Sequence, residues 1–188
     1  DGQIVYIVEY SPATTVSAAA PWTDPRDGEV YQTVKIGDQI WMTENLRYNS
    51  AGSYDMNATP ANSTTHGKLY TWAGAGNAIP TGWHLPTDAE WHLLEKSQGM
   101  PVAELAIEGE FAVRGGAGSI GTLLQGAPMN FLPSGYHDGN NSYVLNAPSW
   151  KGFGDETYLW ANTQVGGASP YRRKLIKNPA GQGSAFRY

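Results

Sequence analysis

Cysteine is absent from the 188 residues of the chain, and charged residues are scarce. Without cysteine there is no disulfide framework, no thiolate metal site and no cysteine nucleophile. Asp, Glu, Lys and Arg supply only 15% of the residues, against roughly 25% in an average soluble domain. No stretch approaches the ~20 apolar residues that cross a bilayer, so we expect no transmembrane segment. Because the chain opens at Asp1 without a charged-then-apolar leader, we expect any signal segment to be absent from this sequence.

Basic charge is also in short supply. The chain carries 12 basic and 17 acidic residues, a net charge of −5, which disfavours a nucleic-acid surface. Only Arg172-Arg173-Lys174 forms a basic run, and we expect these three residues to be a solvated strand edge rather than a phosphate site. Nucleic acid is therefore not an expected partner.

Aromatic residues and turn formers are abundant instead. Aromatic side chains make up 12% of the chain, with 23 Gly and 12 Pro. Disordered chains are poor in aromatics, whereas Trp and Tyr bury large apolar surfaces. The length fits one domain with a sizeable core. We therefore expect one folded, turn-rich domain.

The N-terminal part reads differently from the rest. Residues 1–23 contain a strand-like Ile4–Val8 and a weakly structured Ser11–Ala20, which we interpret as an N-terminal strand plus linker, or as the remnant of an upstream region. The main domain is expected over residues 24–188. Its first element is a predicted β-hairpin over 30–42, with a turn at Gly37-Asp38, and Val30 is expected on the same strand face as Val34 and Ile36.

Helix signals are concentrated in the middle of the chain. Residues 49–66 lack apolar periodicity and predict a long surface loop of the kind that is often functional. Thr87 and Glu90 have the spacing of a capping box, which predicts a helix from Asp88 to about Gln98. A second, shorter helix is predicted over Met100–Ile107.

Short strands follow toward the C-terminus. Residues 119–124 are expected to form one helical turn. The predicted β-segments after it are Phe131-Leu132, Asn141–Leu145, Glu156–Ala161 and Ser184–Tyr188. Helices in the first part and strands at both ends indicate an α+β domain with an antiparallel sheet.

Several short segments occur in a fixed order along the chain: Asp24–Tyr31, Thr33–Leu46, Gly67–Ala73, Gly82–Trp91, Leu132–Tyr136 and Tyr158–Thr163. In this order they resemble the Fibrobacter succinogenes major paralogous domain family, from Asp24 to Tyr188. Trp83–Trp91 is also similar to an element of formylglycine-generating enzymes, whose domain is a C-type-lectin-like relative. The resemblance therefore implies a C-type-lectin-like domain with an antiparallel sheet, one or two helices and long loops.

The resemblance also implies a location. The family is known chiefly from secreted or surface proteins, often lipoproteins, of the Bacteroidetes and Fibrobacteres. We therefore expect an extracellular or outer-surface anchored protein whose partner is a glycan or a protein outside the cell.

Catalysis is not expected. The formylglycine-generating relatives use a metal held by two thiolates, and this chain has none. Its four histidines, His66, His84, His92 and His137, show no spacing typical of a metal pair. No Gly-x-Ser-x-Gly elbow marks a serine nucleophile. We predict a non-catalytic protein without a catalytic cofactor.

Calcium is the one metal that the sequence leaves open. The paired motifs with which sugar-binding C-type lectins hold this ion are missing. The turn that carries Asp24, Asp27 and Glu29 is rich in oxygen ligands and is a candidate structural calcium site. The alternative is a tight turn whose aspartates cap backbone amides.

Recognition residues accumulate in the late part of the chain. Tyr and Trp give broad, rigid contact area there, and Asn and Gly adapt their hydrogen bonding, a mixture typical of recognition loops. The alternative for Tyr158 and Trp160 is that they fill the core. The candidate ligand-binding residues are Tyr136, His137, Asp138, Asn140, Asn141, Tyr143, Trp150, Tyr158, Trp160, Asn162, Tyr171 and Arg172.

Two other roles stay open beside the binding module. The domain is alternatively a structural or adhesive part of a surface assembly such as a fimbrial tip, because a free Ile4–Val8 strand would pair with another subunit's sheet edge. It is alternatively a C-type-lectin-like receptor with hypervariable late loops.

Overall fold

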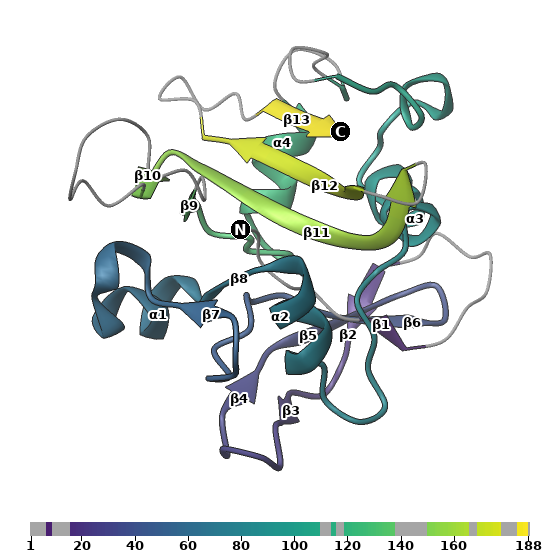
Figure 1. The fold of residues 1–188 in the computed structure, drawn as a ribbon. Coiled ribbons are helices and arrows are strands. Elements are labelled where there is room, and N and C mark those ends of the chain that lie inside the picture. The colour runs from purple at the N-terminus through teal and green to yellow at the C-terminus, as the bar shows by residue number, and fades with distance from the viewer. Residues whose placement is uncertain are drawn as a thin grey trace.

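Helices and mainly antiparallel strands form the computed structural model of the chain, which confirms the α+β class. The structure describes residues 7–8, 16–109, 114–115, 119–137, 150–165, 169–177 and 184–187. The strands of these residues form two larger sheets and two short strand pairs (Figure 1). In the described part of the chain, no helix is long and apolar enough to cross a bilayer.

The first sheet has the order β1-β6-β5-β2. Its strands are β1 (Ile7–Val8), β2 (Val16–Ala18), β5 (Thr33–Ile36) and β6 (Gln39–Met42). β1 pairs with β6 of the same chain, and β2 pairs with β5. The expectation of a free N-terminal strand is therefore wrong for its described residues, and so is that of a weakly structured segment at residues 16–18.

The predicted hairpin is confirmed as β5 and β6, with Gly37 at a φ of 62° in the turn. The face assignment at its start is wrong, because Val30 is 48% exposed and Tyr31 is fully buried. β4 (Val30–Tyr31) pairs with β3 (Trp22–Thr23) rather than continuing into β5. The interruption at Gln32 breaks the alternation that the sequence pattern assumes.

The second sheet has the order β10-β9-β11-β12-β13. Its strands are β9 (Ser134–His137), β10 (Trp150–Phe153), β11 (Glu156–Val165), β12 (Ser169–Ile176) and β13 (Ser184–Arg187). Neighbours run antiparallel except β9 and β11, which are parallel. α4 (Ser119–Gln125) packs against β12 and β13, and β9 and β10 lie at the opposite end of the sheet (Figure 1).

The predicted capping box at Thr87 is confirmed. The Thr87 hydroxyl accepts the Glu90 amide, and the Glu90 carboxylate accepts the Thr87 amide at 2.8 Å. α3 runs over Asp88–Ser97 and buries Trp91 and Leu94 completely.

The predicted loop over residues 49–66 is wrong. It contains β7 (Ser53–Tyr54), the 3-10 helix η1 (Met56–Ala58) and α1 (Pro60–His66). α1 has few apolar residues, so its signal was only the proline in its first turn. β7 pairs with β8 (Leu69–Tyr70), which the helix α2 (Trp72–Ala78) follows.

Two further predicted elements differ from the structure, and one lies outside it. The second helix is only the 3-10 turn η2 (Val102–Glu104), because Val102 and Ile107 stay exposed and supply no packing that would stabilise a longer helix. Phe131-Leu132 is not a strand, since β9 begins at Ser134. Residues 141–145 and 188 lie outside the described residues.

Buried charges join α3 to the second sheet. Arg173 is 1% exposed and donates to Asp88 Oδ1 and Glu95 Oε1, each at 2.7 Å. Arg114 donates to Glu95 Oε1 at 2.6 Å, and Arg187 to Asp88 Oδ2 at 2.7 Å. The prediction that the basic run is a solvated strand edge is therefore wrong at Arg173, whose strand β12 lies inside the sheet.

Candidate functional site

Aromatic side chains from three strands meet beside the end of the second sheet that β9 and β10 form. The Tyr54 ring of β7 stacks on the His137 ring of β9, with centroids 6.2 Å apart and planes 12° apart. Trp150 of β10 packs edge-on against His137 at 4.6 Å. Tyr54 is 44% exposed, and His137 and Trp150 are partly exposed. We name Tyr54, His137 and Trp150 the aromatic surface.

Strand pairing explains why the predicted residues His137 and Trp150 lie together. They are directly opposite partners in the antiparallel β9–β10 pair, so their side chains leave the sheet on the same face. Figure 1 shows β7 on the side of the molecule where β9 and β10 lie. The register of β9 and β10 therefore fixes the pairing of His137 with Trp150, while Tyr54 comes from β7, which pairs with β8.

A second aromatic pair lies on the other face of β9, because Tyr136 directly precedes His137 in the strand. The rings of Tyr136 and Tyr158 lie 4.6 Å apart, with the cationic groups of Arg172 and Lys174 5.3 Å and 5.2 Å from the Tyr158 ring. Burial, together with the neighbouring Tyr158, raises the pKa of the Tyr136 hydroxyl. Tyr136 and Arg172 are partly exposed, but Tyr158 is buried.

Three of the predicted binding residues lie elsewhere. Trp160 is buried in a core cluster, where its indole N–H donates to the Tyr70 carbonyl at 2.9 Å. Asn162 lies near the C-terminal end of β11, and its backbone N–H donates to the Pro86 carbonyl. The Tyr171 hydroxyl donates to Glu108 at 2.6 Å. The structure thus gives Trp160 and Tyr158 the core position that was the alternative for both.

Four more of the predicted binding residues lie outside the described residues. These are Asp138, Asn140, Asn141 and Tyr143, all within residues 138–149 between β9 and β10.

The candidate calcium turn has its carboxylates turned to protein donors. Arg26 donates to both Asp24 oxygens, Asp27 accepts the Glu29 amide at 3.0 Å, and Glu29 accepts from Arg47 at 2.7 Å. Burial raises the pKa of Asp24, but the hydrogen bonds and charge of Arg26 outweigh it and lower that pKa. Within the described ranges, no three acidic or histidine side chains are grouped to hold a metal ion. The geometry favours the tight-turn alternative.

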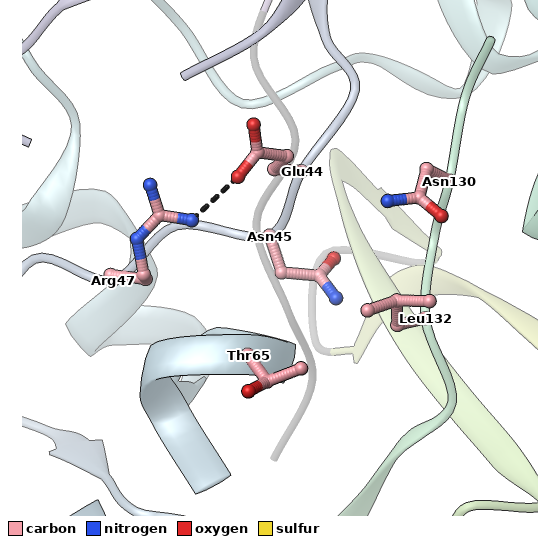
Figure 2. A pocket seen from close by; sticks show the side chains of 6 residues that line it. All are labelled: Glu44, Asn45, Arg47, Thr65, Asn130 and Leu132. Carbon is pink, nitrogen blue, oxygen red and sulfur yellow. Dashed lines mark hydrogen bonds and ion pairs between the residues drawn. The ribbon is translucent and has the colours of Figure 1, made fainter. Parts of the chain in front are cut away.

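A small polar pocket lies apart from these residues, between the chain after β6, the end of α1 and the approach to β9. Its cavity volume is about 30 Å³, room for one or two water molecules. Figure 2 shows Asn45 and Asn130 across the pocket from each other, with Thr65 of α1 beneath them in this view. The complete lining is Glu44, Asn45, Arg47, Thr65, Asn130 and Leu132.

Comparison with known proteins decides the family. The model of the Fibrobacter succinogenes major domain matches residues 34–187. The chain belongs to this family. No curated protein and no solved structure matches it.

Several residues of the aromatic surface and of the pocket in this major domain were not predicted from the sequence. Tyr54 of the aromatic surface was assigned to a structureless loop, and its only signal was that such loops are often functional. Asn45 and Leu132 of the pocket belong to two segments that carry the family resemblance, but the sequence pattern does not show that they meet. Thr65 and Asn130 gave no signal.

Proposed function

We propose that this major domain is a non-catalytic glycan-binding module that works outside the cell or anchored to its outer surface, with a C-type-lectin-like fold. The observation that carries the proposal is the aromatic surface. Three rings are held against one another by separate strands and still reach solvent. Exposed apolar groups that gather in this way typically mark a binding site.

The chemistry of the surface suits a sugar. The flat faces of Tyr54 and Trp150 offer apolar area to the C–H face of a pyranose ring, while the phenol, indole and imidazole edges hydrogen-bond its hydroxyls. Rigid aromatic anchors also lose little side-chain entropy on binding. The position of the rings on paired strands makes the site preorganised, which reduces the cost of binding.

Nearby carboxylates support binding rather than hydrolysis. Asp55 accepts from Lys68 at 2.5 Å, and Glu156 accepts from Lys174 at 2.8 Å. Glycoside hydrolysis needs two carboxyl groups that face the scissile bond as acid and as base or nucleophile, and these two are each engaged by a lysine. Our proposal therefore includes no catalytic residue and no cofactor.

A glycan array tests the proposal. We expect the wild-type protein to bind at least one glycan, and Tyr54→Ala and Trp150→Ala each to weaken binding about thirtyfold, the equivalent of about 2 kcal/mol. Tyr171→Ala is the matched control, because its ring lies on β12 and its hydroxyl bonds Glu108. Thermal unfolding establishes that each variant is folded.

Two results would contradict the proposal. Undiminished glycan binding by both surface variants places the ligand elsewhere. Binding to a protein array with no glycan bound replaces the glycan with a protein ligand.

A further inference from the structure

A row of lysine and tyrosine side chains crosses four strands of the second sheet. Lys151 on β10 lies directly opposite Tyr136 on β9, and Tyr158 on β11 lies directly opposite Lys174 on β12. Directly opposite residues of an antiparallel pair share a face of the sheet. The rings of Tyr136 and Tyr158, 4.6 Å apart, join the two pairs. The four side chains therefore lie on one face.

Arg172 adds a further cation to this face. It is two residues from Lys174, so both side chains leave β12 on the same side. Its guanidinium lies 5.3 Å from the centre of the Tyr158 ring. Arg173, between them in the strand, points the other way, into the buried charge network with α3. We name Lys151, Arg172 and Lys174, together with Tyr136 and Tyr158, the basic face.

The basic face and Glu156 beside it carry three positive charges and one negative charge. Glu156 accepts from Lys174 at 2.8 Å, so this pair is neutral. Lys151 and Arg172 add two positive charges next to the tyrosines. The whole chain, in contrast, has 12 basic and 17 acidic residues. A local excess of positive charge on an acidic protein attracts anions to that place.

The accessible groups of the basic face suit an oxyanion on a sugar. Lys151 is exposed, and Arg172 and Tyr136 are partly exposed. A guanidinium donates two parallel hydrogen bonds to a carboxylate or a similar oxyanion, and an ammonium adds a point charge. The Tyr136 ring offers flat apolar area beside them, and its hydroxyl can hydrogen-bond a sugar hydroxyl. A charged group attached to a ring of that size is an acidic sugar.

We propose that the basic face binds the carboxylate or sulfate group of an acidic sugar, with Arg172 donating to the oxyanion and Lys151 adding its charge. The basic face shares no residue with the aromatic surface. That a sugar carries the oxyanion rests on the proposed function, and the module accordingly prefers acidic to neutral glycans.

The test is a titration of the whole chain, labelled with 15N, observed by NMR at the Arg172 Nε–H and the Tyr136 amide. The probes galactose, galacturonate and galactose 6-sulfate differ only at carbon 6. Each is added to about 50 mM at constant ionic strength, a range that detects millimolar dissociation constants. We expect at least one charged sugar to bind at least ten times more tightly than galactose. We expect inorganic sulfate, added separately, to bind at least ten times more weakly than galactose 6-sulfate.

Three results of this titration would overturn the inference. In the first, neither charged sugar shifts the Arg172 signal. In the second, galactose binds as tightly as the charged sugars. In the third, inorganic sulfate binds as tightly as galactose 6-sulfate, which removes the sugar from the assignment.

A charge-matched pair of variants shows whether the basic face is the site. We expect the double variant Lys151→Gln, Arg172→Gln to weaken binding of the charged sugar at least tenfold, observed at the Tyr136 amide. The double variant Lys35→Gln, Lys96→Gln is the control, because it removes the same charge from exposed residues of β5 and α3. Equal losses in the two double variants show that net charge alone attracts the sugar and contradict the site.

Tyr54→Ala separates this inference from the proposed function, since Tyr54 lies on β7, outside the second sheet. We expect it to weaken array binding and to leave the shifts at Arg172 unchanged. Shifts at Arg172 without any glycan whose binding depends on Tyr54 contradict the aromatic surface alone. Array binding that needs Tyr54 but is accompanied by no shift at Arg172 contradicts the basic face alone.

Discussion

Replacing Arg173 by Met tests the buried charge network that joins α3 to β12. Methionine keeps much of the apolar bulk but leaves Asp88 without the 2.7 Å bond from Arg173 and Glu95 with Arg114 as its remaining arginine. Breaking a buried ion pair by removing one partner typically costs about 3–5 kcal/mol. For a domain of this length that corresponds to a fall in melting temperature of roughly 6–20 °C.

Urea unfolding followed by tryptophan fluorescence measures the loss. The matched control is Arg172→Met, because Arg172 is the preceding residue of β12, is only partly buried and lies 5.3 Å from the Tyr158 ring. We expect this variant to lose about 1 kcal/mol or less. Equal losses in the two variants, or a loss below about 1 kcal/mol for Arg173→Met, would refute the reasoning, since Asp88 and Glu95 each lose one of two arginine partners and keep only Arg187 and Arg114, respectively.

Three further predictions concern acid, a glycine and calcium. Burial raises the pKa of Asp88, but the hydrogen bond from Arg187 and the charge of Arg173 outweigh it and lower that pKa from 3.8 to about 2. The ionised Asp88 therefore contributes at most about 2 kcal/mol of stability, which is present above pH 4 and lost as the pH falls toward 2. Asp88→Asn should flatten that part of an acid-unfolding curve. Gly67→Ala should destabilise the protein by about 1–2 kcal/mol and shift the Asn45 amide signals, because Gly67 has a φ of 79° and the added Cβ would lie 2.4 Å from the Asn45 Cβ. Gly76→Ala is the neutral control, since Gly76 is a helical residue with open space around it. An equal effect of the two substitutions contradicts the packing argument. Calcium or a chelator should change the melting temperature by less than about 1 °C, since the carboxylates of residues 24–29 already accept from protein donors; a rise of several degrees in millimolar calcium contradicts that account.

Local signals in the sequence predicted the elements that local energetics define. The hairpin has a turn glycine and the helix at Asp88 has a complete capping box, so both form, although the hairpin consists of β5 and β6 alone and does not include Val30 and Tyr31 as predicted. The sequence did not predict α1 (Pro60–His66), because its seven residues bury only Ser63 and show no apolar stripe. The family motifs predicted the family, which the match over residues 34–187 shows.

The candidate site depended on contacts that no local pattern contains. His137 and Trp150 were both predicted as binding residues. Their contact follows from the register in which β9 pairs with β10, and the sequence alone does not show that register. Arg173 was predicted to be solvated because the sequence does not show that β13 pairs with β12 and makes β12 an inner strand of the sheet. Asn45 is an ordinary polar residue in sequence, and it is distinguished only by its burial and by an Oδ1 that has no hydrogen-bond partner among the described residues.

Mapping a bound glycan onto the aromatic surface tests the central claim most directly. The glycan that binds best on the array is titrated into labelled protein, and the indole signal of Trp150 and the imidazole signals of His137 are followed by NMR. We predict that the largest changes in the spectrum occur at these two rings and at Tyr54. A saturating titration that leaves the signals of both rings unchanged contradicts the account.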